Sequence, residues 1–346
     1  MQLERRKVAI FNDTSPGGHY GCSAVMQVLV ESLKSVAMEP VAFWPCGRDW
    51  RRHRGAIRKL GMDALIVNGE GSIHHSRNRP RARFLAELGP FARDELKVPC
   101  VLLNASFHDL DPETIEHLKA FDLVFARESA SQSYLRDNGI MADMVPDLSF
   151  FAHVGRDGAP LRGVPFVTDS VRREVSAALR TLSAEQGFDY EVMKYSQKSA
   201  AGTGGGSRVL SALKTNLSKA FTALSAHSFL ERDIAENPGF DPFVRKIQSS
   251  PVVITGRFHT VTLCLSQRTP FVAFESNTSK ISDLLSDIFG HSERCLPFSE
   301  ENVDFVGANW RSFMPFSDAE LAAIDSYLQD ASQRRAAMLQ KIGEIA

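Results

Sequence analysis

An arginine and a histidine, two residues apart, stand where an apolar strand pattern gives way to a helical one. The run from Pro251 to Thr255 is apolar and β-branched, and Gly256, Arg257 and His259 follow it. In an open parallel sheet, ligands bind beyond the carboxyl ends of the strands, where the next helix also points its free N–H groups. Arg257 is a permanent, fork-shaped cation suited to carboxylate or phosphate, and His259 can exchange a proton near neutral pH. The pair therefore suits an anionic substrate that must be protonated; the alternative is an arginine paired with a carboxylate beside a buried structural histidine.

Polar residues also follow several other predicted strands. In chain order, these candidate site residues are Asn68, Glu70, Asn104, His108, Arg127, Glu128 and Asp147. Because the carboxyl ends of parallel strands meet at one edge of a sheet, they predict a crevice along that edge. The turn over residues 12–21 adds His19 among glycines. Its spacing differs from the dinucleotide pattern G-x-G-x-x-G, so we interpret it as a binding loop rather than a cofactor fingerprint.

The elements that must position these residues alternate between strand and helix. Strands are predicted at 7–11, 40–43, 64–67, 101–104, 123–125, 143–145, 165–168, 190–195, 251–255 and 270–274, and helices at 23–36, 80–95, 112–120, 129–138, 171–185, 208–225, 242–248, 281–289 and 317–345. This alternation is typical of doubly wound parallel sheets. We therefore expect an α/β protein with two doubly wound, Rossmann-like domains that face a central cleft, in the arrangement called GT-B-like.

The length of 346 residues also favours two domains, because a single hydrophobic core rarely grows this large. A stretch rich in glycine and proline at 154–164 predicts the linker. The expected units are an N-terminal domain (1–155), a C-terminal domain (156–316) and a last helix (317–346) that packs back toward the first domain. Residues 196–207 are rich in glycine and serine and predict a loop or lid; a phosphate cradle is the alternative.

Composition narrows the classes of function. The net charge is −1, from 40 basic and 41 acidic side chains, so no global field favours nucleic acid. The five cysteines are odd in number and widely spaced, which favours reduced thiols in a cytoplasmic protein. The sequence has no signal-peptide pattern and no apolar run of about 18 residues. No Cys/His cluster has the spacing of metal ligands, so neither a metal nor a cofactor is expected.

Two stretches are locally basic. Residues 48–59 and 77–83 each contain several arginines. Such runs usually form a solvated helix face. The alternative is a patch that meets an anionic glycan or a lipid-linked acceptor at the inner face of a membrane.

Several of these segments together resemble the polysaccharide pyruvyltransferase family. The segments are Arg127-Glu128-x-x-Ser131, Val145-Pro146-Asp147, Gly256-Arg257-Phe258-His259, and Thr269 to Phe274 leading to Lys280. The resemblance extends from the first strand to about residue 290.

The resemblance implies transfer of a carboxyethylidene group from phosphoenolpyruvate to two hydroxyls of a sugar, with a ketal and phosphate as products. Phosphoenolpyruvate would be a co-substrate bound by the C-terminal domain, and the acceptor a sugar or lipid-linked oligosaccharide on the N-terminal side. Arg127, Arg257 and Lys280 would bind the donor, and His259 would transfer the proton. Glu70, Asn68, His108, Asp147 and His19 are candidates to support His259 or the acceptor, and the sequence leaves open which carboxylate assists His259.

The N-terminal domain departs from the family pattern. The first turn lacks the aspartate of many members, and Glu70 stands where a glycine is common. These changes bear on the acceptor more than on the donor. Two other functions fit the same fold: a nucleotide-sugar glycosyltransferase, in which Arg257 and Lys280 would bind a diphosphate, and a non-catalytic binding or scaffold protein.

Overall fold

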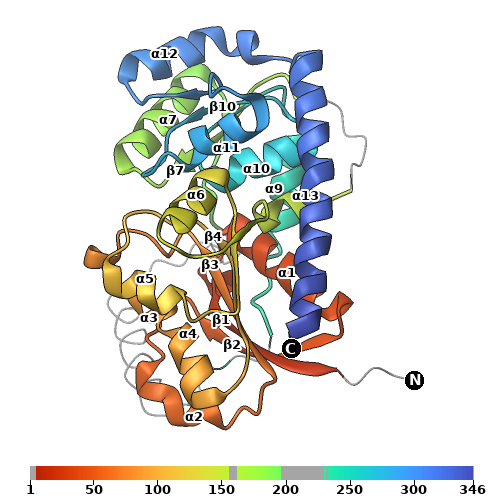
Figure 1. Cartoon of the computed structure of the whole chain (residues 1–346). Coiled ribbons are helices and arrows are strands. Elements are labelled where there is room, and N and C mark those ends of the chain that lie inside the picture. Colours follow the sequence, from red (N-terminus) through yellow and green to blue (C-terminus); the bar gives the residue numbers. More distant parts are fainter. Residues whose placement is uncertain (1–4, 156–161, 196–229, 231–232, 346) are drawn as a thin grey trace, which may run out of the picture.

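The computed structural model describes residues 5–155, 162–195, 230 and 233–345, and it contains two parallel sheets (Figure 1). The first sheet has the order β2-β1-β3-β4-β5-β6. Its strands are β1 (Arg6–Asp13), β2 (Met38–Pro45), β3 (Ala64–Glu70), β4 (Cys100–Ala105), β5 (Leu123–Ala126) and β6 (Asp143–Met144). The second sheet has the order β11-β10-β9-β7-β8. Its strands are β7 (Phe166–Ser170), β8 (Asp189–Glu191), β9 (Val253–Gly256), β10 (Phe271–Phe274) and β11 (Cys295–Leu296).

Helices cover both faces of each sheet. They are α1 (Tyr20–Ser35), α2 (Arg54–Arg58), α3 (Pro80–Ala86), α4 (Leu88–Phe91), α5 (Pro112–Leu118), α6 (Ser129–Asp137), α7 (Arg173–Gln186), α9 (Phe240–Gln248), α10 (Phe258–Gln267), α11 (Lys280–Phe289), α12 (Glu300–Asn309) and α13 (Asp318–Ile345). The strands alternate their side chains between the two faces. Val8 and Ile10 of β1 join the core beneath α1, whereas Ala9 and Phe11 join the core beneath α3 and α4. The predicted doubly wound α/β class is therefore confirmed by the two parallel sheets.

A continuous hydrophobic cluster joins the two halves. Residues of β1 and α1 belong to the same buried cluster as residues of β9, α9 and α10. At its centre the ring of Tyr20 stacks on Phe243 with the ring centroids 4.4 Å apart. The Tyr20 hydroxyl also donates a hydrogen bond to Glu191 Oε1 (2.8 Å). This shared core fixes the first turn of α1 against the second sheet.

Helix α13 runs along the length of the molecule beside both sheets (Figure 1). With 28 residues it is about 42 Å long. Near its end, Lys341 Nζ pairs with Asp143 Oδ2 (2.6 Å), and Arg6 Nη1 donates to the Gly343 carbonyl (2.9 Å). Nearer its start, Arg268 pairs with Asp325 (2.6 Å). The last helix therefore contacts both halves of the chain.

Two predicted elements differ from those observed. The helix expected over residues 80–95 is broken into α3, α4 and a π-helical turn (Ala92–Leu96). Pro90 cannot donate a backbone hydrogen bond, and at Gly89 an added Cβ would lie 2.7 Å from the Phe121 ring, so this segment bends to follow the core. The strand expected over 190–195 ends at Glu191, because the Tyr195 N–H donates instead to the Gly18 carbonyl (2.7 Å).

Some predictions fall wholly or partly outside the described residues. These are the loop at 196–207, the helix at 208–225 and most of the linker at 154–164. Among the described residues, no helix is both long and apolar enough to cross a membrane.

Candidate active site

A cavity of about 470 Å³ lies where the two halves meet. From the first half it is lined by Asp13, Thr14, Pro16, Gly17, His19, Cys22, Pro45, Cys46, Glu70, Gly71, Ser72, Arg81 and Arg127, and from the second by Val171, Lys194, Arg257, Phe258, His259 and Lys280. Helices α1, α10 and α11 all begin at this cavity. Because free N–H groups and the positive dipole end point out of each helix start, the cavity favours an anion.

The strand–helix junction that carries Arg257 is closely packed. An added Cβ at Gly256 would lie 2.5 Å from Ser170 Oγ, so only glycine lets β9 approach β7 here. Arg257 is the N-cap of α10, and Asp169 of β7 accepts hydrogen bonds from both its Nε (3.0 Å) and its Nη2. Part of the guanidinium is therefore paired with a carboxylate, and the side chain still lines the cavity.

His259 lies two residues after Arg257, in the first turn of α10, and Asp147 lies behind it. Asp147 Oδ2 is 3.7 Å from His259 Nε2, a close approach that is too long for a hydrogen bond. Asp147 is 1% exposed and accepts hydrogen bonds at Oδ1 from the N–H (2.9 Å) and hydroxyl (2.6 Å) of Ser149. Burial opposes ionisation of Asp147, but His259, Arg127 and Ser149 outweigh it and lower its pKa. Asp147 is thus the carboxylate that faces His259.

Arg127 connects this pair to the first sheet. Its Nη1 donates to Asp147 Oδ2 (2.9 Å) and its Nε donates to Ser106 Oγ (2.7 Å). Glu128 lies 3.3 Å from Nε. Burial alone would lower the pKa of Arg127, but the two carboxylates outweigh it and raise the pKa. The guanidinium is therefore a fixed cation on the cavity wall.

Lys280 stands between this cavity and a second one. It lines both, and its Nζ lies 5.9 Å from the ring centroid of Phe258, a ring that Arg127 also covers at 4.4 Å. Among the described residues, the polar contact of the Lys280 ammonium is with an amide oxygen, because its Nζ donates to Asn277 Oδ1 (3.5 Å). Burial and the neighbouring Arg127 and Arg257 lower its pKa to about 8, against the opposing effect of Glu275 and Glu128.

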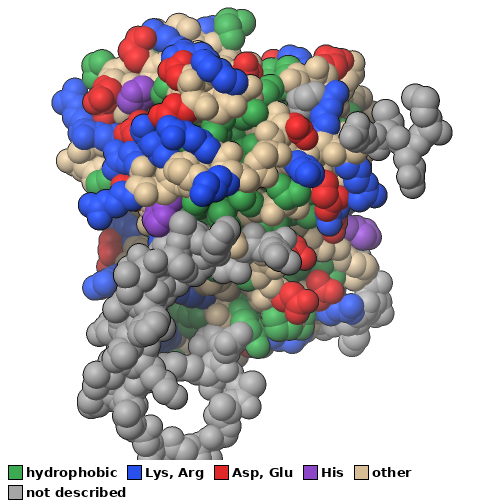
Figure 2. Space-filling model, turned by 90° about the horizontal axis from the view of Figure 1, so that it is seen from below, with side chains coloured by type: hydrophobic (Ala, Val, Ile, Leu, Met, Phe, Trp, Pro, Cys, Tyr) green, Lys and Arg blue, Asp and Glu red, His purple; other side chains and the backbone are tan. Residues whose placement is uncertain are grey.

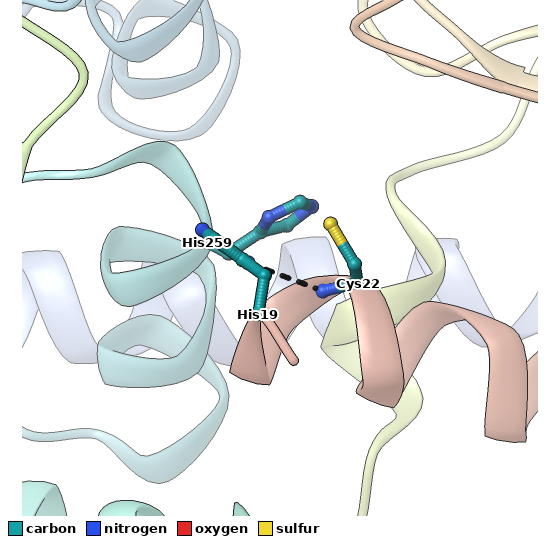
Figure 3. A group of neighbouring side chains, drawn as sticks. All are labelled: His19, Cys22 and His259. Atoms are coloured by element: carbon teal, nitrogen blue, oxygen red, sulfur yellow. Dashed lines mark hydrogen bonds between the residues drawn. The ribbon is translucent and has the colours of Figure 1, made fainter. Parts of the chain in front are cut away.

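The first turn of α1 brings a histidine and a thiol against His259 (Figure 3). His19 is the N-cap of α1, and its Nδ1 accepts a hydrogen bond from the Cys22 N–H (3.4 Å). The rings of His19 and His259 lie with their centroids 5.6 Å apart. Burial and the positive charges of His259, Arg257 and Lys280 hold the pKa of His19 well below its usual value.

Glu70 forms the opposite wall with three supporting groups. Its Oε1 accepts hydrogen bonds from Thr14 Oγ1 (2.5 Å) and Asn68 Nδ2 (3.1 Å), and Cys22 Sγ donates to Oε2 (3.3 Å). Asn68 itself is fully buried beneath Glu70 and does not line the cavity. Glu70 has φ of +40°, a conformation that favours glycine, so the carboxylate is held there at some backbone cost.

His108 lies apart from this group. It is exposed and lines the second pocket, of about 300 Å³, with His74, His75, Tyr134 and Asp283. The chain after β4 turns toward α6 rather than toward α10, so His108 does not lie beside His259. The residues that lie beside His259 are Asp147 and His19.

Sequence reasoning missed several residues of the cavity. Asp169 follows the same rule as the other strand ends, since it lies at the end of β7 and holds Arg257. Arg81 belongs to the second basic stretch and enters the cavity. Lys194 and Cys22 gave no sequence signal, because a backbone bridge between His19 and Lys194 and the close packing of α1 bring them to the site.

The basic stretches are partly neutralised in the structure. Arg51 pairs with Asp49 and Glu87, and Arg54 pairs with Glu95. Seen from below, the molecular surface carries acidic side chains as well as basic ones (Figure 2). The charge that these stretches present is thus lower than their sequence suggests.

A comparison with protein families finds one family model that matches most of the segments lining the cavity. Residues 19–278 match the model of the polysaccharide pyruvyl transferase family. The chain belongs to this family. The match includes Arg127, Asp147, Arg257 and His259, and it ends just before Lys280. The protein is accordingly a transferase, and the family resemblance read from the sequence is confirmed.

Solved structures with a similar fold include a UDP-bound protein and a UDP-GlcNAc 2-epimerase, and they agree with the predicted GT-B-like arrangement. S. aureus MnaA with UDP has 14% identity and a TM-score of 0.54, over 92% of this chain and 91% of that chain. UDP-GlcNAc 2-epimerase from Neisseria meningitidis, bound to UDP-GlcNAc, has 12% identity and a TM-score of 0.53, over 94% and 100%. At such identity the likeness concerns the fold alone. No curated protein sequence matches the chain.

Proposed function

We propose that this protein transfers a carboxyethylidene group from phosphoenolpyruvate to two hydroxyls of a sugar in a bacterial surface polysaccharide or its precursor. The observation that carries the proposal is the buried Asp147–His259 pair, which faces a cavity lined by Arg127, Arg257 and Lys280. A proton-transfer group beside fixed cations is what an enol phosphate needs. Membership of the pyruvyl transferase family supports the same reaction class.

The donor carries a carboxylate and a phosphate, and the cavity offers complementary groups to both. Arg257 keeps N–H groups beyond those that Asp169 engages, and Lys280 has no carboxylate partner among the described residues. The starts of α10 and α11 add their N–H groups. We assign the donor to the side of the cavity formed by Arg257 and Lys280, where Arg127 is the third cation.

The reaction balances with one donor and two hydroxyls. His259 protonates the methylene carbon of phosphoenolpyruvate, which gives a methyl group and an oxocarbenium-like carbon beside the phosphate oxygen. The first sugar oxygen attacks this carbon and loses its proton. Phosphate then leaves, and the second hydroxyl oxygen forms the second C–O bond of the ketal. One hydroxyl proton replaces the proton that His259 gave, and the other leaves with the phosphate.

Asp147 stabilises the protonated form of His259 from behind, because its negative charge is buried and fixed at 3.7 Å. Arg127 and Arg257 stay charged throughout and stabilise the anionic groups of the donor from the cavity wall. No step in this scheme requires a metal or an organic cofactor.

The first-half wall suits the acceptor. Glu70, Thr14, Asp13 and Ser72 present oxygen atoms to the cavity, and such groups bind sugar hydroxyls. Glu70 departs from the glycine common in the family, so we expect it to influence which acceptor binds. His19 stands between this wall and His259.

A direct experiment compares phosphoenolpyruvate with UDP-, GDP- and CMP-linked sugars by thermal shift and calorimetry. We expect phosphoenolpyruvate alone to stabilise the wild type, and Arg257→Ala to weaken its binding by about 2–5 kcal/mol. Arg136→Ala, at an exposed arginine of α6, is the matched control and should bind as the wild type does. Stabilisation by a nucleotide sugar instead would move the assignment to a glycosyltransferase. Binding of none of these ligands would favour the non-catalytic scaffold.

A cytoplasmic enzyme at the inner face of the membrane fits a lipid-linked acceptor. Basic stretches 48–59 and 77–83 would supply that contact, although ion pairs already engage part of them. Flotation with anionic vesicles at low salt tests this part of the proposal. No binding even at low salt would refute the membrane contact and leave the transfer reaction unaffected.

A further inference from the structure

Three side chains with metal-binding atoms converge at the cavity. Their ligand atoms, from His19, Cys22 and His259, all lie within 4.8 Å of one another. The chain separates residue 22 from residue 259, so the spacing rules applied to the sequence could not detect this group. We propose that His19, Cys22 and His259 bind a soft divalent cation such as Zn²⁺.

The local structure holds the three groups on one side of α1. His19 and Cys22 are three residues apart in the first turn, so their side chains share a face of the helix. His259 approaches from the first turn of α10 (Figure 3). Gly21 permits this approach, because an added Cβ would lie 2.5 Å from His259 Nδ1. The helix packing therefore brings the third ligand to the first two.

The separations require only a small adjustment. Zn–S and Zn–N bonds of about 2.3 and 2.0 Å place tetrahedral ligand atoms roughly 3.3–3.8 Å apart. The three atoms must therefore move closer by no more than about 1.5 Å, which side-chain rotation can supply. All three residues line the cavity, which gives the ion an entry path.

Groups around the three ligands complete the site. Asp147 lies 3.7 Å from His259 Nε2, a buried nitrogen without a hydrogen-bond partner among the described residues. A carboxylate behind a histidine ligand orients the ring and increases its basicity. On the other side, Glu70 Oε2 lies 3.3 Å from Cys22 Sγ and can serve as a fourth ligand or as an outer partner.

Coordination also balances chemically. The S–H bond of Cys22 breaks, a sulfur–metal bond forms, and the proton passes to Glu70 Oε2 or to water. Arg257 and Lys280, which line the same cavity, oppose any cation there. Binding therefore depends on the thiolate, and a hard cation such as Mg²⁺ should bind much more weakly than Zn²⁺.

The bound ion would bridge α1 of the first half and α10 of the second. It would also occupy His259, so that this residue could no longer donate a proton. Metal binding itself is independent of the proposed reaction, whereas its inhibitory effect rests on the proposed function. The site would thus make the transferase sensitive to zinc.

The test uses the full-length protein after removal of metal. Zn²⁺ is titrated in competition with a chromophoric chelator, and Co²⁺ reports thiolate ligation through its sulfur-to-metal charge-transfer absorption. We expect one ion per chain, binding that is weaker by at least about tenfold in Cys22→Ser and in His19→Gln, and no charge-transfer band in Cys22→Ser. Cys46→Ser, the matched control at another thiol of the cavity, should retain the band.

Wild-type affinity in Cys22→Ser, or loss of the band in Cys46→Ser, would overturn the assignment. If Cys22→Ser does not fold, His19→Gln decides by affinity alone. These readings need no phosphoenolpyruvate, so failure of the metal site is distinct from failure of the proposed reaction. In the active wild type, Zn²⁺ should slow transfer and a chelator should restore it; an unchanged rate at saturating Zn²⁺ would refute inhibition.

Discussion

Asp147 and His259 come from different halves of the chain and meet with Oδ2 and Nε2 3.7 Å apart. Asp147 follows the last strand of the first sheet, and His259 begins the helix after the central β9 strand of the second. The same carboxylate also binds Arg127. One buried aspartate therefore links a donor-binding candidate to the proton-transfer candidate.

Removal of the imidazole should stop proton transfer and leave the fold intact. His259→Ala is expected to lower turnover by about 10²-fold or more, the usual contribution of a general acid–base group. Steady-state kinetics with phosphoenolpyruvate and the acceptor measure it. His291→Ala, at an exposed histidine beyond α11, is the control. Equal rates in the two variants would remove His259 from the mechanism.

Asp147→Asn should destabilise the protein as well as slow it. The change leaves Arg127 buried with one of its two carboxylates missing, and loss of one partner from a buried ion pair costs about 3–5 kcal/mol. Denaturant unfolding gives the free energy. Asp143→Asn removes the partner of Lys341 on the surface and should cost no more than about 1 kcal/mol. Equal losses of unfolding free energy in the two variants would contradict a stabilising role for the buried Arg127–Asp147 ion pair.

Because of Lys280, the affinity for phosphoenolpyruvate should decrease at alkaline pH. The Lys280 pKa of about 8 means that the ammonium is lost as the pH rises through that value, and the affinity for an anionic donor should fall with it. In Lys280→Arg the charge persists, so the fall should move to higher pH. Calorimetry from pH 7 to 9.5 checks this, and identical profiles for both proteins would exclude Lys280 as a donor ligand.

Lys280 should also reduce stability near neutral pH. Its folded pKa lies below the ordinary lysine pKa of 10.5, so the unfolded chain binds more protons between about pH 8 and 10.5, and stability should rise with pH across that window. Lys280→Met should raise the melting temperature at pH 7 and remove this rise. A lower melting temperature in Lys280→Met would show that the charged lysine stabilises the fold.

A methyl group at Gly21 should disturb the site from the side of α1. Gly21→Ala places the new Cβ 2.2 Å from His259 Cβ and 2.5 Å from His259 Nδ1, so α1 and α10 must shift apart and carry His259 with them, at a cost of about 1–3 kcal/mol in overpacking. Turnover should fall while phosphoenolpyruvate still binds. Gly55→Ala has no atom within 4 Å of the added carbon and serves as control. Wild-type turnover in Gly21→Ala would mean that the position of His259 is not critical.

Much of the site could be predicted because it obeys a local rule. Arg127, Asp147, Arg257 and His259 each lie within three residues of the end of a strand, and parallel strands end at a common edge. The hydrophobic pattern and the order of the strands along the chain therefore place these residues. Lys280 begins the helix after β10 for the same reason. Asp169 obeys the rule too and could have been found by it.

Other relationships had no local signal. Cys22 lies within a helix, and its thiol enters the site only because Tyr20 packs on Phe243 and fixes α1 against the second half. Lys194 enters because the chain after β8 bridges to His19.

The sequence by itself determined the α/β class, the family and the strand-end residues, because these depend on hydrophobic period, turn residues and motif order. Only the tertiary structure decided which carboxylate faces His259, that Arg257 is shared with Asp169, and that His108 belongs to a second pocket. It also brought His19 and Cys22 to His259. These outcomes depend on how the two sheets and α1 pack together. Packing contacts between residues that are distant in the chain produce no periodic pattern or fixed spacing in the sequence, so they cannot be predicted from it.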